Sequence, residues 1–190
     1  MIEILTSYDT QLFFLIHDGL RSTLLDKILP ILRNKITWIP LYLFILYYSY
    51  KVFDKKIWYF IAISIGIVVV GDTMCASILK PWVERMRPCH YFLGYKHFHD
   101  FYICSATYSF PSCHATNHSA LAVFWSWSFK KRWLSIFLTL WALVVGYAQI
   151  YVGVHYPTDI TGGFIIGSSI GYLGYKLFLL FFQPSIKQRL

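Results

Sequence analysis

From residue 57 to residue 79 the sequence reads IWYFIAISIGIVVVGDTMCASIL, a run that is apolar apart from Asp72. A helix that crosses the hydrocarbon core of a bilayer needs about 20 mostly apolar residues. This run reaches that length, so it predicts a transmembrane helix and points to a membrane protein.

The composition of the whole chain agrees with this interpretation. Of its 190 residues, 57% are hydrophobic and only 14% are charged, and the mean hydropathy is +0.52. Soluble domains carry about 25% charged residues. The chain also contains 15 Tyr and 7 Trp, residue types that gather at the headgroup level of a bilayer. We therefore expect a polytopic membrane protein.

The formal net charge of +8 has two interpretations. In a soluble chain, basic residues on one polar face indicate a nucleic-acid partner. Here Lys and Arg lie between the apolar runs, where they are typical of cytoplasmic loops and of sites for anionic substrates. We expect no nucleic-acid partner.

Four further runs predict membrane helices, and with residues 57–79 they form one all-α domain. They are residues 36–53, 115–129, 133–154 and 160–182. The first 35 residues mix apolar and charged side chains, which predicts amphipathic helices lying at the membrane interface. A short sixth span within them is the alternative. We expect a bundle of five to six transmembrane helices over residues 36–182 and a tail at 183–190.

The positions of Lys and Arg predict the orientation, because cytoplasmic loops are enriched in both residues. Three segments are basic: Lys51, Lys55 and Lys56, then Lys130, Lys131 and Arg132, and finally Lys187 and Arg189 in the tail. With five spans, all three fall on one side, which we assign to the cytoplasmic side of the plasma (inner) membrane. The N-terminus, the loop at residues 80–111 and the loop around His155 then share the extracytoplasmic face.

The first of three polar clusters on that face contains Lys80, Arg85 and Arg87. Three cations within eight residues repel one another unless an anion lies among them, and both Arg and Lys bind phosphate oxygens. The alternative is that they are cations at a helix end that extend to the interface.

The other two clusters carry histidines. Ser112 and His114 precede a predicted helix, whose N-terminus presents free N–H groups to an anion; the alternative for Ser112 is a helix cap. Asp159 follows His155 by four residues, and a carboxylate beside an imidazole fixes its tautomer and stabilises its cation. The alternative for Asp159 is also a helix cap. Together the clusters predict a phosphate site with a nucleophile and an acid.

These residues resemble the motifs of the type 2 phosphatidic acid phosphatase (PAP2) family of membrane phosphatases. The first motif, K-x6-RP, is matched by Lys80, Arg87 and Pro88, and the second, PSGH, by Pro111, Ser112 and His114. The third, SR-x5-H-x3-D, is matched by His155 and Asp159. The order and internal spacing agree, and the resemblance covers roughly residues 57–182.

The resemblance implies a role for each matched residue. His155 attacks phosphorus and forms a phosphohistidine, Asp159 orients His155, and His114 protonates the leaving oxygen. Lys80 and Arg87 bind phosphate oxygens, Ser112 and the backbone at Cys113 donate further hydrogen bonds, and no metal or other cofactor is required. The implied partners are a lipid phosphate and the surrounding membrane lipids; the sequence says nothing of oligomeric state.

Two positions depart from the family pattern. Ala148 and Gln149 replace the Ser-Arg pair of the third motif, so one cation is missing, although an amide still donates two N–H bonds. Arg85 is a candidate to replace that cation. Cys113 replaces the Gly of the second motif, and we interpret it as a tolerated small residue.

The remaining cysteines predict one disulfide. Cys89 and Cys104 flank the outer loop, and a disulfide between them can persist outside the cytoplasm. Cys75 lies within a predicted span, and we expect it to be an inert small residue.

The function expected from these residues is a lipid phosphate phosphatase. Undecaprenyl diphosphate is the favoured substrate, because the site faces outward and the chain is short; phosphatidylglycerophosphate, phosphatidic acid and lipid A phosphates are alternatives. A metal-dependent hydrolase or metal transporter is a second class, suggested by the spacing of His114 and His118, but Lys80 and Arg87 would repel a cation. A non-catalytic lipid-binding relative is a third class, suggested by Gln149.

Overall fold

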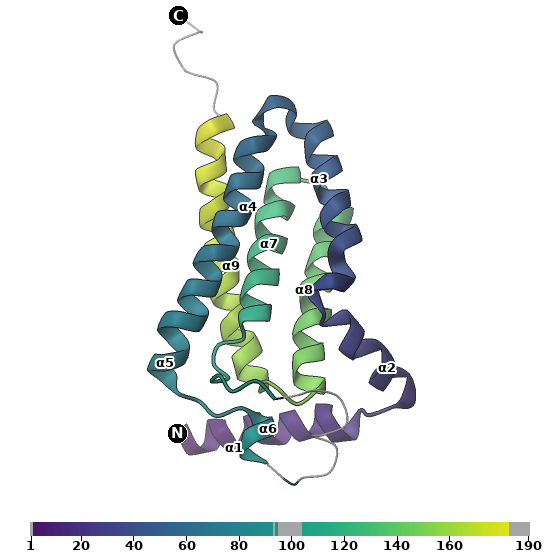
Figure 1. The fold of residues 1–190 in the computed structure, drawn as a ribbon, viewed down its shortest axis with the longest axis vertical. Coiled ribbons are helices and arrows are strands. Elements are labelled where there is room, and N and C mark those ends of the chain that lie inside the picture. Colours follow the sequence, from purple (N-terminus) through teal and green to yellow (C-terminus); the bar gives the residue numbers. More distant parts are fainter. Residues whose placement is uncertain (1, 93, 95–103, 183–190) are drawn as a thin grey trace, which may run out of the picture.

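The computed structural model describes residues 2–92, 94 and 104–182, and within these residues every regular element is a helix. Figure 1 shows the long helices standing side by side and α1 lying across one end of them. The α-helices are α1 (Ile2–Phe14), α2 (Thr23–Leu32), α3 (Ile39–Phe53), α4 (Ile57–Asp72), α5 (Lys80–Val83), α6 (Pro88–Tyr91), α7 (Cys113–Phe129), α8 (Arg132–Tyr151) and α9 (Pro157–Phe182). Shorter 3-10 and π segments are η1 (Leu15–Gly19), η2 (Lys35–Trp38), η3 (Asp54–Lys56) and η4 (Thr73–Leu79).

The all-α class predicted from the sequence is confirmed, and each predicted span coincides with a helix. Several boundaries differ by a few residues. In particular, the span predicted at 133–154 ends at Tyr151, the last residue of α8. Gly153 has a φ of +85°, a conformation that glycine adopts without strain and that leaves the helix. The loop that carries His155 begins at this point.

Three helical segments of the described chain are long and apolar enough to cross a membrane: Lys35–Tyr91, Arg132–Tyr151 and Pro157–Phe181. The first of them reverses direction at Asp54, whose φ is +47°, so that α3 and α4 form a hairpin (Figure 1). The exact number of spans stays a prediction.

Helix α7 lies at the centre of the bundle, where it contacts α4, α8 and α9. Most of its side chains are buried, including Thr116, Ser119 and Phe124. Because neighbouring helices surround α7, it can carry more polar side chains than the lipid-facing helices. This position also fixes its first residues at the candidate site.

Small residues bring α9 close to α7. A side chain at Gly163, Gly167 or Gly171 of α9 would collide with the backbone of α7, at Ser112, Thr116 and Ala120 respectively. Glycines spaced four residues apart are typical of close helix packing in membranes. The contact holds the start of α9, with Asp159, next to the start of α7.

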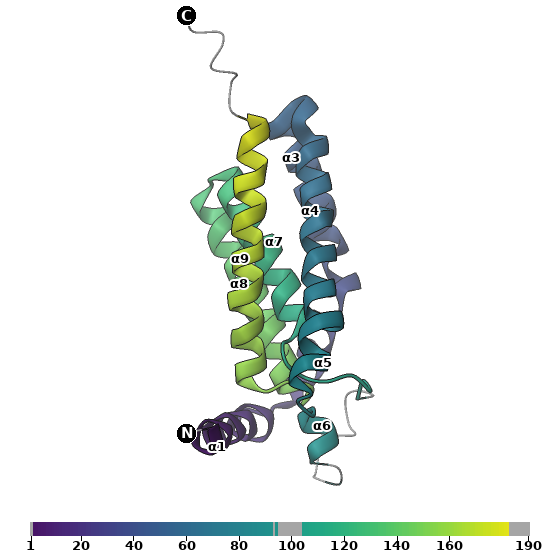
Figure 2. The same cartoon turned by 90° about the vertical axis from the view of Figure 1, so that its left-hand side faces the viewer.

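The N-terminal helices cover the end of the bundle at which α8 ends (Figures 1 and 2). Phe13 and His17 are fully buried there, and His17 Nδ1 donates to the carbonyl oxygen of Tyr151 at 2.7 Å. The Tyr151 hydroxyl donates to Asp26 Oδ1 at 2.5 Å. These contacts join the first helices to the end of α8, directly before the loop that carries His155.

The basic connections lie at the opposite end. Lys55 and Lys56 form the turn between α3 and α4, and Lys130 and Lys131 connect α7 to α8; both turns are at the top of Figure 1. The tail at 183–190, with the basic residues used to predict orientation, lies outside the described residues, as do residues 93 and 95–103 of the loop at residues 80–111.

Candidate active site

A cavity of about 530 Å³ opens where α7 begins and α8 ends. Six of the site residues predicted from the sequence line it: Lys80, Arg87, Cys113, His114, Gln149 and His155. None of the described residues in its wall is acidic. The cavity therefore presents cations, imidazoles and an amide, which together suit a phosphate group.

His155 lies between α8 and α9 and is 2% exposed. Its Nδ1 is 3.4 Å from Asp159 Oδ2, and its Nε2 is 3.3 Å from Arg87 Nη1. A guanidinium only donates hydrogen bonds. Nε2 is therefore the unprotonated nitrogen, whose lone pair accepts from Arg87, and Nδ1 carries the proton that faces Asp159.

Asp159 lies in the first turn of α9 and is fully buried. Its Oδ2 also accepts the Tyr156 N–H at 2.8 Å, and its Oδ1 accepts Arg85 Nη1 at 2.8 Å. The main-chain carbonyl of Asp159 accepts the Ser112 N–H at 3.1 Å. These contacts fix the carboxylate in one orientation, and the carboxylate in turn orients the ring of His155.

The protonation state of His155 follows from its surroundings. Its pKa is lowered to about 4, mainly by burial; Arg87 and Lys80 also lower the pKa, whereas Asp159 raises it. The ring is therefore neutral at pH 7. A neutral imidazole held by a third group is the form in which histidine acts as a nucleophile.

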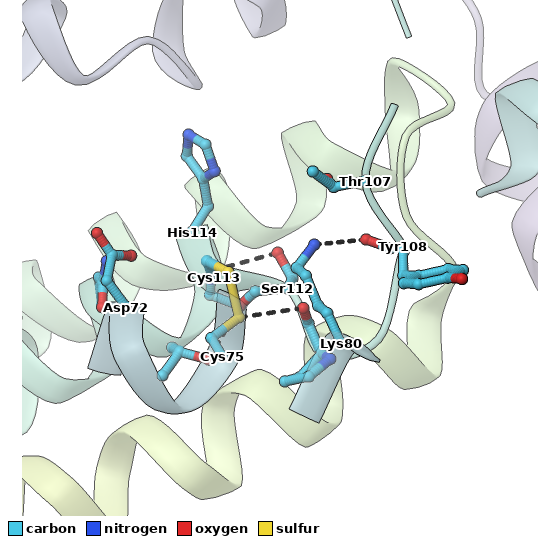
Figure 3. The surroundings of a disulfide bond; sticks show 12 residues. Asp72, Cys75, Lys80, Thr107, Tyr108, Ser112, Cys113 and His114 are labelled. Carbon is cyan, nitrogen blue, oxygen red and sulfur yellow. Dashed lines mark hydrogen bonds between the residues drawn. A yellow bond between two sulfur atoms is a disulfide. The ribbon is translucent and has the colours of Figure 1, made fainter. Parts of the chain in front are cut away.

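Lys80 and Arg87 are both buried, and main-chain carbonyls position their charged groups. Lys80 Nζ donates to Tyr108 O at 2.5 Å (Figure 3). Arg87 donates from Nε to Thr107 O at 2.8 Å and from Nη1 to Val154 O at 3.1 Å. Removing two positive charges from water is costly, and an anion in the cavity would offset that cost.

The first residues of α7 have separate tasks. Ser112 is fully buried, and its hydroxyl accepts the Ala115 N–H at 3.4 Å, which makes Ser112 the N-cap. The structure thus gives this hydroxyl the capping role, and its bond to phosphate stays a prediction. His114, in the first turn, lines the cavity together with His155.

His118 is held outside the cavity wall. Its Nδ1 donates to His114 O at 2.8 Å, and its ring packs on Trp141 with centroids 4.7 Å apart. Within residues 2–92, 94 and 104–182, no three His, Cys, Asp or Glu side chains are grouped so as to hold a metal ion. The metal-site interpretation therefore finds no support in this part of the chain.

Arg85, the candidate to replace the missing cation of the third motif, is bonded to two carboxylates in this structure. Arg85 does not line the cavity. Its Nη2 pairs with Asp9 Oδ2 at 2.5 Å, and its Nη1 bonds both Thr158 Oγ1 at 2.7 Å and Asp159 Oδ1. The Arg85 guanidinium is thus held between the carboxylates of Asp9 and Asp159. It contacts Asp159 through Oδ1, whereas His155 contacts Oδ2.

The cysteines form two disulfides. Cys89 is bonded to Cys104, the pair predicted from the sequence. Cys75 is bonded to Cys113, which corrects the interpretation of Cys75 as an inert residue and of the Cys113 side chain as merely tolerated. Cys75 lies in η4 shortly before Lys80, and Cys113 opens α7, so this bond joins the first motif to the second (Figure 3).

Two residues at the site carried no signal in the sequence. Arg33, which follows the last residue of α2, lines the cavity and is 7% exposed. Asp9 of α1 accepts the Thr158 N–H at 2.9 Å and pairs with Arg85. Both belong to the N-terminal segment, outside the three motifs, so no spacing rule could select them.

The chain is similar to several known proteins. The profile of the PAP2 superfamily matches residues 61–182. The lipid A 4'-phosphatase of Bacteroides thetaiotaomicron is 41% identical over 186 residues, covering 92% of this chain and 79% of that protein. The lipid A 4'-phosphatase of Porphyromonas gingivalis is 32% identical, with coverage of 87% and 71%. An undecaprenyl-diphosphatase of Sulfolobus acidocaldarius is 28% identical, with coverage of 90% and 78%.

The fold also has a counterpart among solved structures. The crystal structure of a transmembrane PAP2-type phosphatidylglycerolphosphate phosphatase from Bacillus subtilis superposes with a TM-score of 0.71 at 22% identity. The match covers 92% of this chain and 86% of that one. At this identity the similarity demonstrates a shared fold.

Proposed function

The chain belongs to the PAP2 superfamily and is a membrane lipid phosphatase, and from this premise we propose that it removes a phosphate from lipid A through a phosphohistidine on His155. The observation that carries the mechanism is the pairing of His155 with Asp159 beside a cavity lined by cations. The observation that carries the substrate is the 41% identity to a lipid A 4'-phosphatase over most of both chains.

In the first step, Nε2 of His155 attacks phosphorus. A bond forms between Nε2 and phosphorus, and the bond from phosphorus to the ester oxygen breaks. Asp159 accepts the Nδ1–H of His155 and stabilises the positive charge that develops on the ring. Arg87, 3.3 Å from Nε2, and Lys80 neutralise the phosphate oxygens.

His114 is the acid of this step. It gives a proton to the leaving oxygen, so that the sugar hydroxyl departs without charge. A bound phosphate dianion favours the protonated form of a nearby imidazole. Water then attacks the phosphohistidine, His114 takes back a proton, and inorganic phosphate leaves with His155 restored.

Undecaprenyl diphosphate, which the sequence favoured, is the second candidate. It is supported by the 28% identical relative named for that substrate, which matches 90% of this chain. The higher identity to the two lipid A 4'-phosphatases favours lipid A, a phosphate monoester, over this diphosphate. We further propose that the site lies on the extracytoplasmic face, since the basic turns lie at the opposite end of the bundle.

The test is phosphate release by the purified protein in detergent. The substrates are lipid A, undecaprenyl diphosphate, phosphatidylglycerophosphate and phosphatidic acid, with mass spectrometry to identify the position dephosphorylated. We expect lipid A to be the best substrate, His155→Ala to abolish release, and EDTA to leave it unchanged. Rapid quenching with radiolabelled substrate should trap an acid-labile phosphoenzyme in the wild type only.

His90→Ala is the matched control. His90 lies outside the cavity wall, where its Nε2 meets Ser105 O at 2.9 Å, so this variant should retain activity. Faster release from undecaprenyl diphosphate than from lipid A would overturn the substrate assignment. Equal release by His155→Ala would overturn the mechanism.

A further inference from the structure

Gln149 places an incompletely bonded amide in the wall of the cavity. The residue is fully buried, and neither its Oε1 nor its Nε2 has a hydrogen-bond partner among the described residues. Leaving a buried polar group unbonded is unfavourable. A ligand bound in the cavity can supply the hydrogen-bond partner that the Gln149 amide lacks.

The same residue leaves the site one cation short. Gln149 occupies the position at which the third PAP2 motif has Arg. An amide can donate to a phosphate oxygen but cannot neutralise its charge. The remaining motif cations, Lys80 and Arg87, face a group that carries close to two negative charges.

Arg33 brings another positive charge to this cavity. It follows α2, which packs against α8, the helix that carries Gln149. Both residues line the cavity, as does His114, and Arg33 is only 7% exposed. A guanidinium presents a planar fork of donors that matches phosphate oxygens.

The backbone around Arg33 is held firmly from both sides. Its N–H donates to Leu29 O at 3.0 Å. The two preceding carbonyls are also bonded, that of Ile31 by Thr37 Oγ1 at 2.6 Å and that of Leu32 by Trp38 Nε1 at 2.7 Å. These bonds fix the backbone at the end of α2, and with it the position from which the Arg33 side chain reaches the cavity wall.

We propose that Arg33 is a phosphate-binding residue that supplies the cation absent from the third motif, with Gln149 donating a hydrogen bond beside it. The guanidinium would bind a non-bridging oxygen of the phosphate that His155 attacks. The inference rests on the proposed function in taking the cavity as the phosphate site. The N-terminal segment is then part of the active site.

The test compares Arg33→Gln with Lys35→Gln. Lys35 is an exposed cation two residues away that lines an apolar groove instead of the site cavity, so both variants remove one charge from the same segment. We expect Arg33→Gln to lower kcat/KM and to raise the inhibition constant of orthovanadate, each by about 10- to 100-fold. Lys35→Gln should change neither, and Arg33→Lys should lie between Arg33→Gln and the wild type.

Moving the positive charge from position 33 to position 149 tests whether the two side chains bind the same phosphate oxygen. Gln149→Arg should lower activity in the wild type, where two guanidiniums would compete, but should raise activity when added to Arg33→Gln. Losses that simply add in the double variant would overturn the proposal. So would an unchanged orthovanadate constant in folded Arg33→Gln, or an equal loss in Lys35→Gln.

Two further experiments test the role of Arg33 if Arg33→Gln does not fold or if lipid A is not a substrate. If Arg33→Gln does not fold, Arg33→Lys replaces it, and a rise of less than about threefold in the orthovanadate constant overturns the proposal, because Lys keeps the charge but not the fork. Thermal stabilisation by orthovanadate needs no lipid substrate. It therefore reports on Arg33 even if lipid A is not hydrolysed.

Discussion

Single residues around His155 set the protonation state on which the proposed chemistry depends. Burial and the two cations of the first motif favour the neutral ring, whereas Asp159 favours the charged ring. The nucleophile is thus neutral before attack and is stabilised by a carboxylate as it becomes positive. The same balance makes the pH dependence of the reaction a test of the site.

We predict that kcat/KM falls at acid pH around pH 4, the pKa of His155, rather than around 6.5. Asp159→Asn removes the group that raises this pKa, so the acid limb should move to still lower pH. The same variant should lower kcat by about 100-fold or more, because the ring loses its orientation and charge stabilisation. Steady-state pH profiles of both proteins measure this; an acid limb that moves to higher pH in Asp159→Asn contradicts it.

Arg85→Gln distinguishes a positioning residue from a phosphate ligand. Arg85 holds Asp159 Oδ1 and does not line the cavity, so we predict a fall of about 10-fold in kcat with little change in KM. A loss of about 1–3 kcal/mol of stability should accompany it, because Asp159 loses a charged hydrogen bond. The control is Arg132→Gln, an exposed cation at the start of α8. A rise in KM at unchanged kcat would restore the role predicted from the sequence.

At the scale of elements, the pairing of α7 with α9 sets the geometry of the site. The proposed catalytic residues lie at the beginnings of these helices: His114 is in the first turn of α7, His155 lies just before α9, and Asp159 is in the first turn of α9. Close approach through Gly163, Gly167 and Gly171 keeps the two helix starts together. Changes deep in the bundle should therefore affect catalysis.

We predict that Gly167→Ala destabilises the protein, because the new methyl group would overlap the backbone carbonyl of Thr116 and the Ser119 hydroxyl. Overpacking of this kind costs about 1–3 kcal/mol. Gly66→Ala is the matched control, since a methyl group there meets nothing within 4 Å. Thermal unfolding in detergent should show a lower midpoint for Gly167→Ala alone; equal midpoints would mean that α9 can shift without cost.

The Cys75–Cys113 disulfide is a second link between elements at the site. It closes a segment with a sequence separation of 38 residues, and a disulfide over such a distance contributes about 3–4 kcal/mol. We predict that Cys75→Ala lowers both thermal stability and activity. Peptide mapping without reductant should recover Cys75 linked to Cys113 and Cys89 linked to Cys104. Free thiols at Cys75 and Cys113 in the purified protein would disprove the first bond.

At the scale of the whole molecule, the site and the basic turns lie at opposite ends of one bundle (Figure 1). The N-terminal helices cover the site end, through contacts such as His17 with Tyr151 and Asp9 with Arg85. The arrangement suits a lipid whose headgroup is processed at one membrane surface.

We predict that alkaline phosphatase fused after Gly94 is active, whereas the same enzyme fused after Lys130 is inactive. Alkaline phosphatase folds only outside the cytoplasm, because it needs disulfides, and the basic turn at Lys130 marks the cytoplasmic side. The reverse pattern of activities would place the site in the cytoplasm and would remove the oxidising environment that both disulfides require.

Much of the fold could be predicted from local properties of the sequence. Hydropathy over about 20 residues identifies a membrane helix wherever it lies in the chain, so the helices α3, α4, α7, α8 and α9 were predicted within a few residues. The catalytic candidates were also accessible, because their motifs have fixed spacing along the chain. His155 and Asp159 are only four residues apart in the chain, so their proximity could be expected from the sequence, although His155 lies in the loop before α9.

What the sequence by itself determined is the all-helical membrane fold, the family and the residues of its three motifs. Only the tertiary structure decided that Arg85 serves Asp159 instead of the cavity, that Cys75 bonds to Cys113, and that Arg33 reaches the site. Each of these depends on which distant segments meet, and contacts between segments are set by packing of the whole bundle. The sequence showed that Gln149 stands where the third motif has a cation. That Arg33 lies close enough to replace this cation followed only from the tertiary structure.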